Sequence, residues 1–401
     1  MLAPKSPPTL LTLILLTGTS TLSLNMIMPS LVSIARDLDA AYSTVSLAIS
    51  GYLAATAVVQ LAAGPLSDRF GRRPVILVAL TVFTGASLVC ANAGDIRLLL
   101  VFRMLQAAMI SGFAMSLAIV RDTTSPPQAA GLIGYISMSM AIAPMLGPMV
   151  GGLIDAQFGW RAIFYLYAAA GVTLLLVCLV DLGETHRPSA TRTDANQNGV
   201  RGLLGIPRFW GYALCGAFSV GAFYIFLAGA PLVAATTFSA STSTTGFLIG
   251  SVTGGFITGS FIAGRIAPQV RLTTMMLAGR LISCAGLATG LVLVLLGFVS
   301  EATYFGATLF VGLGNGLTMP SCNAGALSVR PDLAGTAAGL TGALVVATGA
   351  LLTFLTGQVL PDKGAAAMLL ALLLTAALMG LFAAAWTWRM EAGVRSAART
   401  Q

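Results

Sequence analysis

Two long apolar runs, residues 43–63 and 75–92, are joined by the stretch Gly64-Pro65-Leu66-Ser67-Asp68-Arg69-Phe70-Gly71-Arg72-Arg73-Pro74. It holds three arginines and one carboxylate in eleven residues. Gly64 and Gly71 permit backbone conformations and close approaches that a Cβ would forbid. Pro74 suits the first turn of a following helix, because its φ is fixed and it has no N–H. Three arginines between two membrane spans predict a cytoplasmic loop, which is either a topology anchor alone or a functional motif.

The composition places the chain among membrane proteins. Of its 401 residues, 57% are hydrophobic and only 8% are charged, whereas soluble domains carry roughly 25% charged residues. Apolar stretches of ~20 residues, the length that a helical span needs, recur from one end of the sequence to the other. We therefore expect an integral membrane protein with no separate soluble domain.

The net charge of +8 is explained by orientation in the membrane. Fifteen of the 21 Lys and Arg residues fall in segments that we assign to the cytoplasmic side, and four fall outside or at outer span ends. This excess predicts both termini in the cytoplasm and no nucleic-acid partner. The five cysteines stand singly in apolar runs, and the one histidine, His186, lies in a hydrophilic stretch. We therefore expect no metal site, no disulfide and no enzymatic cluster.

The eleven residues that join the two apolar runs resemble the signature between the second and third spans of the major facilitator superfamily of transporters. The resemblance implies an all-α integral membrane protein, with twelve transmembrane helices in two pseudo-symmetric six-helix bundles that work by alternating access. It also implies that the aspartate interacts with the neighbouring half, at the start of span eleven, and with the arginines of the motif, and so gates the closed state. The gating set is thus predicted as Gly64, Asp68, Arg69, Gly71, Arg72 and Arg73.

The apolar runs predict two halves of six spans each. We expect an N-terminal bundle at residues 1–181, a polar cytoplasmic linker at 182–207 and a C-terminal bundle at 208–401. The expected spans are 10–34, 43–63, 75–92, 98–120, 127–154, 162–180, 209–230, 245–264, 272–294, 304–327, 334–359 and 365–388.

Two arginines fall inside the expected spans. Arg103 lies about six residues in from the outer loop, at a depth of ~9 Å, where a charge is costly unless it faces a partner or a watery cavity. Gln106 lies three residues further, on the same helical face, and is able to hold the guanidinium. The pair matches an Arg-x-x-Gln signature that the family links to proton coupling and substrate response; snorkelling to the outer surface is the alternative. For Arg280, close to the inner surface, we expect snorkelling.

Polar and aromatic residues in spans one, two and seven are further candidates for substrate contact. In the bicyclomycin and chloramphenicol resistance branch, which this chain resembles, an aspartate commonly stands four residues before Pro29. Asn25 holds that place here; it can hydrogen-bond a ligand but cannot titrate, or it joins helices inside the bundle. Tyr52 is a polar break in span two. Span seven supplies the aromatic residues Phe223, Tyr224 and Phe226. An aromatic surface suits apolar ligands, although such residues more often pack in a core.

Span five is rich in glycine and proline. Glycines four residues apart let another helix approach closely, and prolines bend or loosen a helix. The pattern resembles the antiporter signature of the superfamily, with Ala143 in place of its middle glycine, and this signature is associated with exporters that exchange drug for proton. A glycine-rich packing helix is the alternative. The residues that match are Gly134, Pro144, Gly147, Pro148, Gly151 and Gly152.

No carboxylate is placed plainly in mid-membrane. All thirteen acidic residues fall in loops or near span ends by this assignment, whereas proton pumps usually place Asp, Glu or His in the membrane. The candidates for the titrating group are Asp37, Asp39 and Asp122. A cavity with Arg103 and no acid disfavours strongly cationic substrates through like-charge repulsion. We therefore expect neutral, zwitterionic or anionic cargo.

Together these features predict a multidrug or small-molecule exporter of the drug:proton antiporter kind. An importer of a small metabolite on the same fold is the alternative, because fold does not fix function. We expect no cofactor, the proton gradient as the energy source, and small amphipathic substrates and the lipid bilayer as partners. The expected location is the inner (plasma) membrane, as a multi-pass monomer.

Overall fold

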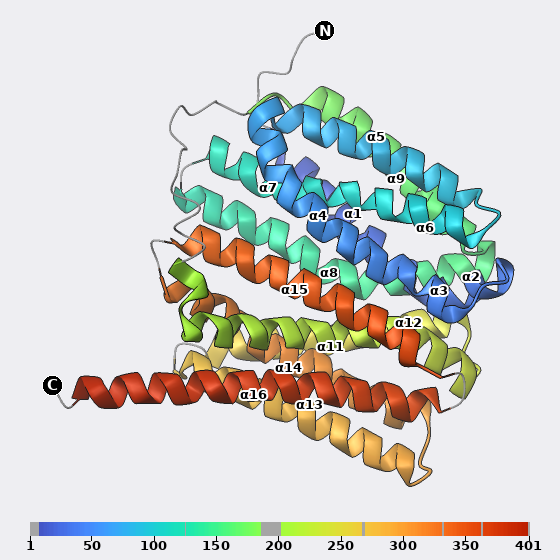
Figure 1. The fold of residues 1–401 in the computed structure, drawn as a ribbon. Coiled ribbons are helices and arrows are strands. Elements are labelled where there is room, and N and C mark those ends of the chain that lie inside the picture. Colours follow the sequence, from blue (N-terminus) through green and yellow to red (C-terminus); the bar gives the residue numbers. More distant parts are fainter. Residues whose placement is uncertain are drawn as a thin grey trace. The chain divides into compact units, whose positions relative to one another are not determined.

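The computed structural model describes residues 8–124, 126–185, 202–266, 269–330, 333–361 and 364–399. Within these ranges every regular element is a helix (Figure 1). The chain divides into two compact units, the first made of Met1–Ala190 with Ala240–Gly250 and the second of Thr191–Ser239 with Ser251–Gln401.

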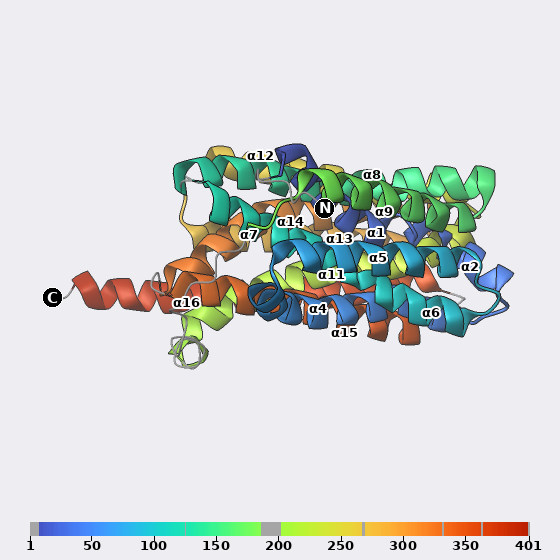
Figure 2. The same ribbon diagram turned by 90° about the horizontal axis from the view of Figure 1, so that it is seen from above.

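The first unit contains the helices that cover expected spans one to six. Its elements are α1 (Leu10–Asn25), η1 (Met28–Ser30), α2 (Leu31–Asp37), α3 (Tyr42–Val45), α4 (Leu47–Phe70), α5 (Arg72–Ala91), α6 (Ile96–Leu105), η2 (Gln106–Met109), α7 (Ile110–Thr123), α8 (Pro126–Phe158) and α9 (Arg161–Asp181). Helices α5 and α9 run side by side in both views (Figures 1 and 2).

In the second half of the chain the described residues form six long helices, which cover expected spans seven to twelve. They are α11 (Pro207–Thr237), α12 (Thr242–Ile266), α13 (Leu272–Leu295), α14 (Glu301–Ser328), α15 (Ala334–Val359) and α16 (Ala365–Arg399). The boundary between the two compact units falls inside α12.

The helices are long and apolar enough to confirm the membrane class. Among the described residues, ten helical segments have the length and composition of a membrane span. Helices α8 and α14, of 33 and 28 residues, also exceed the length that a ~30 Å hydrocarbon core requires. The chain is thus an all-α multi-pass membrane protein with the twelve expected spans.

The connection after span two is shorter than the sequence indicates. We expected a loop over residues 64–74, but α4 continues to Phe70 and α5 begins at Arg72, so Gly71 is the single residue between them. Gly71 has φ of 95°, a conformation that residues with a Cβ rarely adopt. The helix breaks there for that reason, and Asp68 and Arg72, which one continuous helix would place on one face, belong to different helices.

Spans one and four are interrupted by short 3₁₀ segments. In span one, η1 lies between α1 and α2 and carries Pro29 at its start. In span four, η2 begins at Gln106, directly after the turn that carries Arg103. A 3₁₀ segment inside a longer helix often marks a hinge or local strain.

Candidate functional site

Arg103 is the centre of a buried polar network in the first unit. Its side chain is 0% exposed, and its two terminal nitrogens donate hydrogen bonds to Gln106 Oε1 at 2.7 Å and to the backbone carbonyl of Ser23 at 2.6 Å. Gln106 Nε2 in turn donates to Ser87 Oγ at 2.7 Å. The predicted Arg103–Gln106 contact is present, and Arg103 does not snorkel to the outer surface.

Two tyrosines complete the surroundings of this guanidinium. Arg103 lies over the ring of Tyr52, with its central carbon 4.4 Å from the ring centroid, a geometry in which the ring quadrupole attracts the cation. The Tyr52 hydroxyl is 2.6 Å from Ser23 Oγ, and the Tyr167 hydroxyl donates to the Ser23 carbonyl at 3.1 Å. Helices α1, α4, α5 and α9 therefore meet the α6–η2 segment around one cation.

The partners of Arg103 are neutral. A charge in this position needs compensation because burial in a low dielectric is costly, and here carbonyl, amide and aromatic groups supply it. The Nε atom of Arg103 has no hydrogen-bond partner. The network therefore presents a positively charged and incompletely satisfied group inside the membrane.

The sequence identified Tyr52, Arg103 and Gln106, and it missed Ser23, Ser87 and Tyr167. Each of the missed residues is a hydroxyl-bearing residue within an otherwise apolar span. That signal is weak, because a serine hydroxyl also bonds to carbonyls of its own helix, as Ser87 does to Phe83 at 2.6 Å.

Asn25 lies outside this network and faces another helix. Its amide nitrogen donates to the Thr21 carbonyl of its own helix at 2.7 Å. A Cβ built on Gly147 of α8 would lie 2.9 Å from Asn25 Cβ, and one built on Gly151 would overlap the carbonyl oxygen of Met26. These two glycines of the antiporter pattern therefore let α8 pack directly against the end of α1.

The other residues of the antiporter pattern are only partly described. Pro144 and Pro148 lie inside the continuous helix α8, and Gly152 is buried there. Gly134 belongs to the part of α8 whose burial lies outside the described residues. The antiporter role of the pattern stays a prediction.

The gating motif is hydrogen-bonded to residues at the end of α9. Glu184 accepts hydrogen bonds from the backbone N–H groups of Arg72, at 3.0 Å, and Arg73, at 3.3 Å. Arg73 Nη2 donates to the Leu179 carbonyl at 3.0 Å, and a Cβ on Gly71 would overlap the Glu184 carboxylate. The motif thus shares a junction with the residues that end the sixth span.

The remaining motif residues differ in their surroundings. Arg72 is buried and donates to Ser67 Oγ, and Arg69 is exposed, with its guanidinium 5.3 Å from the Phe70 ring centroid. The side chain of Asp68 and the surroundings of Gly64 lie outside the described residues. The proposed meeting of Asp68 with the start of span eleven therefore stays a prediction.

The aromatic residues of span seven do not form one group. Phe226 is fully buried and packs edge-on against Phe305, with ring centroids 6.3 Å apart. Phe223 and Tyr224 are half-buried and pack against each other at 6.2 Å. The surroundings of Phe226 are those of a packed core, so we do not include it in the proposed site.

Arg280 corrects an expectation from the sequence. We expected it to snorkel to the inner surface, but its side chain is 0% exposed. Its Nε donates to Thr318 Oγ1 at 3.1 Å and its Nη2 to Asn315 Oδ1 at 2.7 Å. Helix α14 and its neighbours cover the face of α13 that carries Arg280, and counting residues along α13 could not show this.

Two described acids bear on the question of the proton carrier: Asp37, which is one of the three predicted candidates, and Asp155, which the sequence did not single out. Asp37 is exposed and forms an ion pair with Arg161, and it also accepts a hydrogen bond from Trp160 Nε1 at 3.2 Å. Asp155, in α8, is 9% exposed and accepts a hydrogen bond from Ser33 Oγ at 2.9 Å. Asp39 is exposed, and the side chain of Asp122 lies outside the described residues. Within the described part of the chain, no group of three or more His, Cys, Asp or Glu could hold a metal ion.

Comparisons with known proteins agree with this architecture. Residues 13–353 match the family described as Major Facilitator Superfamily. Multidrug resistance protein D of Escherichia coli (strain K12) is 30% identical over 378 residues, which cover 93% of each chain. YdgK of Bacillus subtilis (strain 168), described as an uncharacterized MFS-type transporter, is 34% identical over 220 residues, or 53% of this chain and 54% of that protein.

The fold is also that of a solved transporter. The crystal structure of a bacterial homologue of the human lysosomal transporter Spinster superposes with a TM-score of 0.76 at 17% identity, covering 94% of this chain and 95% of that one. At that identity the likeness shows the fold alone. The match over residues 13–353, the relative aligned over 93% of its length and the twelve helical spans lead to one conclusion. The chain belongs to the major facilitator superfamily and is a membrane transporter.

Proposed function

We propose that this transporter exports small amphipathic molecules in exchange for protons, with the network around Arg103 as part of its substrate and coupling site. The observation that carries the proposal is the buried guanidinium of Arg103, whose hydrogen-bond partners among the described residues are neutral, next to a 3₁₀ interruption. An ionisable residue inside the membrane is functional by default, because its burial is costly.

The direction of transport is supported by the relatives. Multidrug resistance protein D aligns with nearly the whole chain, and the name of that protein describes resistance to drugs. We infer that this chain, too, moves its cargo outward. The glycines that pack α8 against α1 agree with the antiporter pattern in span five.

Proton coupling requires a group that gains and loses a proton. Arg103 cannot serve, because a guanidinium stays protonated in proteins. Asp37 is exposed and already paired with Arg161, whereas Asp155 is buried against α2. We propose Asp155 as the carboxylate that carries the proton, in preference to Asp37.

The gating role of the motif between spans two and three completes the proposal. Glu184 and Leu179 tie Arg72 and Arg73 to the end of α9, so a change at this junction reaches both helices. We propose that the motif latches one state of the transport cycle, that both termini face the cytoplasm and that the protein works as a monomer.

The test uses an efflux-deficient bacterial host that expresses the full chain. The neutral amphipathic dye N-phenyl-1-naphthylamine is added, and its accumulation in cells is followed by fluorescence. We expect lower accumulation than in cells with an empty vector, and a protonophore should restore the vector level. Accumulation above the vector level would support the importer alternative instead, and accumulation unaffected by the protonophore would contradict proton coupling.

A further inference from the structure

Arg280 forms a second buried cationic site, separate from Arg103 and assigned to no function so far. It lies in α13 and is held by two residues of α14, Asn315 and Thr318. Asn315 Nδ2 donates to the Ser219 carbonyl of α11 at 2.9 Å. The site is therefore built from three helices of the second unit.

Glycines explain why these groups meet. A Cβ on Gly279 would lie 2.7 Å from the carbonyl oxygen of Gly314 and would overlap the Thr318 hydroxyl. A Cβ on Gly380 of α16 would lie 3.2 Å from Arg280 Cδ. Close approach at small residues is how membrane helices pack, and here it encloses the guanidinium between α13, α14 and α16.

The charge of this site is not balanced by the groups that hold it. Both hydrogen-bond acceptors of Arg280 are neutral, a hydroxyl and an amide oxygen. In the described part of the chain, no hydrogen bond or ion pair joins Arg280 to a carboxylate. Its Nη1 is buried and has no hydrogen-bond partner. A buried guanidinium with an unsatisfied nitrogen is unfavourable until an anion supplies both the charge and the acceptor.

The two buried arginines differ in which of their nitrogens lack a hydrogen-bond acceptor. Both terminal nitrogens of Arg103 are bonded, and Tyr52 covers one face of its guanidinium. The nitrogen of Arg103 that has no hydrogen-bond partner is Nε, which carries one N–H. Arg280 leaves a whole terminal nitrogen, with two N–H donors. In the described part of the chain each guanidinium thus uses two of its five N–H donors, but at Arg280 two of the three remaining donors are on one terminal nitrogen that has no partner.

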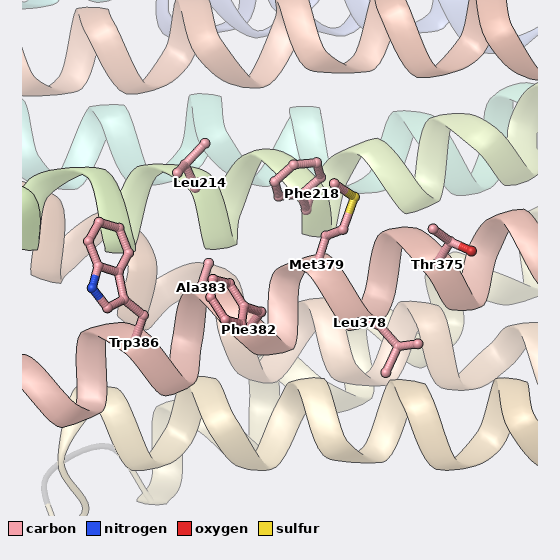
Figure 3. A pocket seen from close by; sticks show the side chains of 8 residues that line it. All are labelled: Leu214, Phe218, Thr375, Leu378, Met379, Phe382, Ala383 and Trp386. Carbon is pink, nitrogen blue, oxygen red and sulfur yellow. The ribbon is translucent and has the colours of Figure 1, made fainter.

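An apolar groove lies beside Arg280. It has a volume of about 420 Å³ and is formed by α11 and α16 (Figure 3). Phe218 and Met379 approach each other across it (Figure 3). A Cβ built on Gly380 would lie 3.6 Å from Phe218 Cβ and 3.9 Å from Arg280 Nη1. The unsatisfied nitrogen thus lies just behind the wall of an apolar surface.

We propose that Arg280, with Asn315 and Thr318, anchors the carboxylate of an amphipathic organic anion whose apolar part lies against Phe218 and Met379. The anion supplies the charge that the protein does not, and Nη1 gains its missing acceptor. This inference rests on the proposed transport function, because it names the class of the cargo.

Binding of a matched pair of compounds tests this site without a gradient. 2-Naphthylacetate and its primary amide share one skeleton and differ in charge. Each is titrated into the purified full-length protein in detergent at pH 7.5 by isothermal titration calorimetry. We expect the carboxylate to bind roughly 10- to 100-fold more tightly than the amide, the range for charge-assisted hydrogen bonds.

Two variants test whether the tighter binding of the carboxylate depends on Arg280. Arg280→Met removes the cation and should bring the two affinities to within about twofold, with binding of the amide retained. Asn315→Asp keeps Arg280 but supplies an internal carboxylate, and it should abolish the preference as well. Arg265→Met is the matched control, because Arg265 is exposed near the end of α12 and lies over Phe261. It should leave the preference unchanged.

The outcomes are distinct from those of the transport assay. No preference for the carboxylate in the unmodified protein, or a preference that survives both Arg280→Met and Asn315→Asp, overturns the anchoring site. Loss of the preference in Arg103→Met alone would place the anion at Arg103 and equally overturn it. If the preference is present and depends on Arg280 but no proton-driven efflux is seen, the proposed function fails and the anion site stands.

Discussion

Glu184 accepts a hydrogen bond from the backbone N–H of Arg72 at 3.0 Å. Arg72 is the first residue of α5, and Glu184 stands three residues beyond the end of α9. The carboxylate thus caps the N-terminus of α5, where unpaired N–H groups and the helix dipole favour a negative charge. This contact joins the motif between spans two and three to the segment that leaves span six.

Loss of this cap should weaken the first unit. We expect Glu184→Ala to lower the free energy of unfolding by about 1 kcal/mol, as for other helix caps. Thermal unfolding of the purified protein in detergent measures the change. Asp39→Asn is the control, because Asp39 is exposed with φ of 45° and asparagine tolerates that conformation. Equal midpoints for Glu184→Ala and the unmodified protein would show that the cap contributes nothing.

Gly71 should tolerate no side chain, for two separable reasons. Its φ of 95° and ψ of 160° lie in a region essentially restricted to glycine, which costs another residue roughly 1–3 kcal/mol, and the new Cβ would overlap Glu184. In a double-mutant cycle, Gly71→Ala should therefore cost less in the Glu184→Ala background than alone. Gly85→Ala in α5 is the control, because nothing lies within 4 Å of its Cβ position. Additive effects of the two changes would argue against the overlap.

Arg103 should be needed for transport more than for folding. We expect Arg103→Gln to lower the rate of dye efflux at least about tenfold, since a buried charged donor to two acceptors is lost. Arg103→Lys should lower the efflux rate nearly as much, because an ammonium cannot reproduce the planar guanidinium that reaches Gln106 and Ser23 together. The measurement is initial efflux rate at matched expression. Arg97→Gln, at an exposed position of the same helix, serves as the control, and an equal loss there would remove the specific role.

Substitution of Asp155 should affect proton-driven efflux but not substrate exchange. In proteoliposomes, Asp155→Asn is expected to abolish efflux driven by an imposed proton gradient while downhill exchange of labelled for unlabelled substrate continues. Asp37→Asn, which removes the exposed ion pair with Arg161, should keep both activities, because exposed ion pairs contribute at most about 1 kcal/mol. Gradient-driven efflux by Asp155→Asn would exclude Asp155 as the proton carrier.

Alanine substitutions of two glycines in α8 should destabilise the protein to different extents. At Gly151 a Cβ would overlap the Met26 carbonyl, whereas at Gly147 it would meet Asn25 Cβ at 2.9 Å. Backbone cannot yield as a side chain can, so Gly151→Ala should lower the unfolding temperature and the yield of folded protein more than Gly147→Ala. Gly18→Ala in α1 has no neighbour within 4 Å of its Cβ position and should be neutral. The reverse order would contradict direct packing of α8 on α1.

The membrane class, the number of spans and the contact between Arg103 and Gln106 could all be predicted from the amino-acid sequence. These follow from local properties: apolar runs of sufficient length, and a spacing of three residues on one helix. The sequence also indicated Gly71 as a special position. It did not show that the motif is helical up to Phe70, because only the φ of 95° at Gly71 decides where the helix breaks.

Which polar groups meet depends on how the helices pack against one another, and the sequence did not show this. Ser23, Ser87 and Tyr167 join Arg103 from three other helices, and Glu184 reaches Arg72 across 112 positions in sequence. Arg280 shows the reason most clearly. Its distance from the end of α13 suggested access to the surface, but glycine contacts bring α14 and α16 over it. Depth along a helix is a property of one segment, whereas burial depends on which neighbours cover each face.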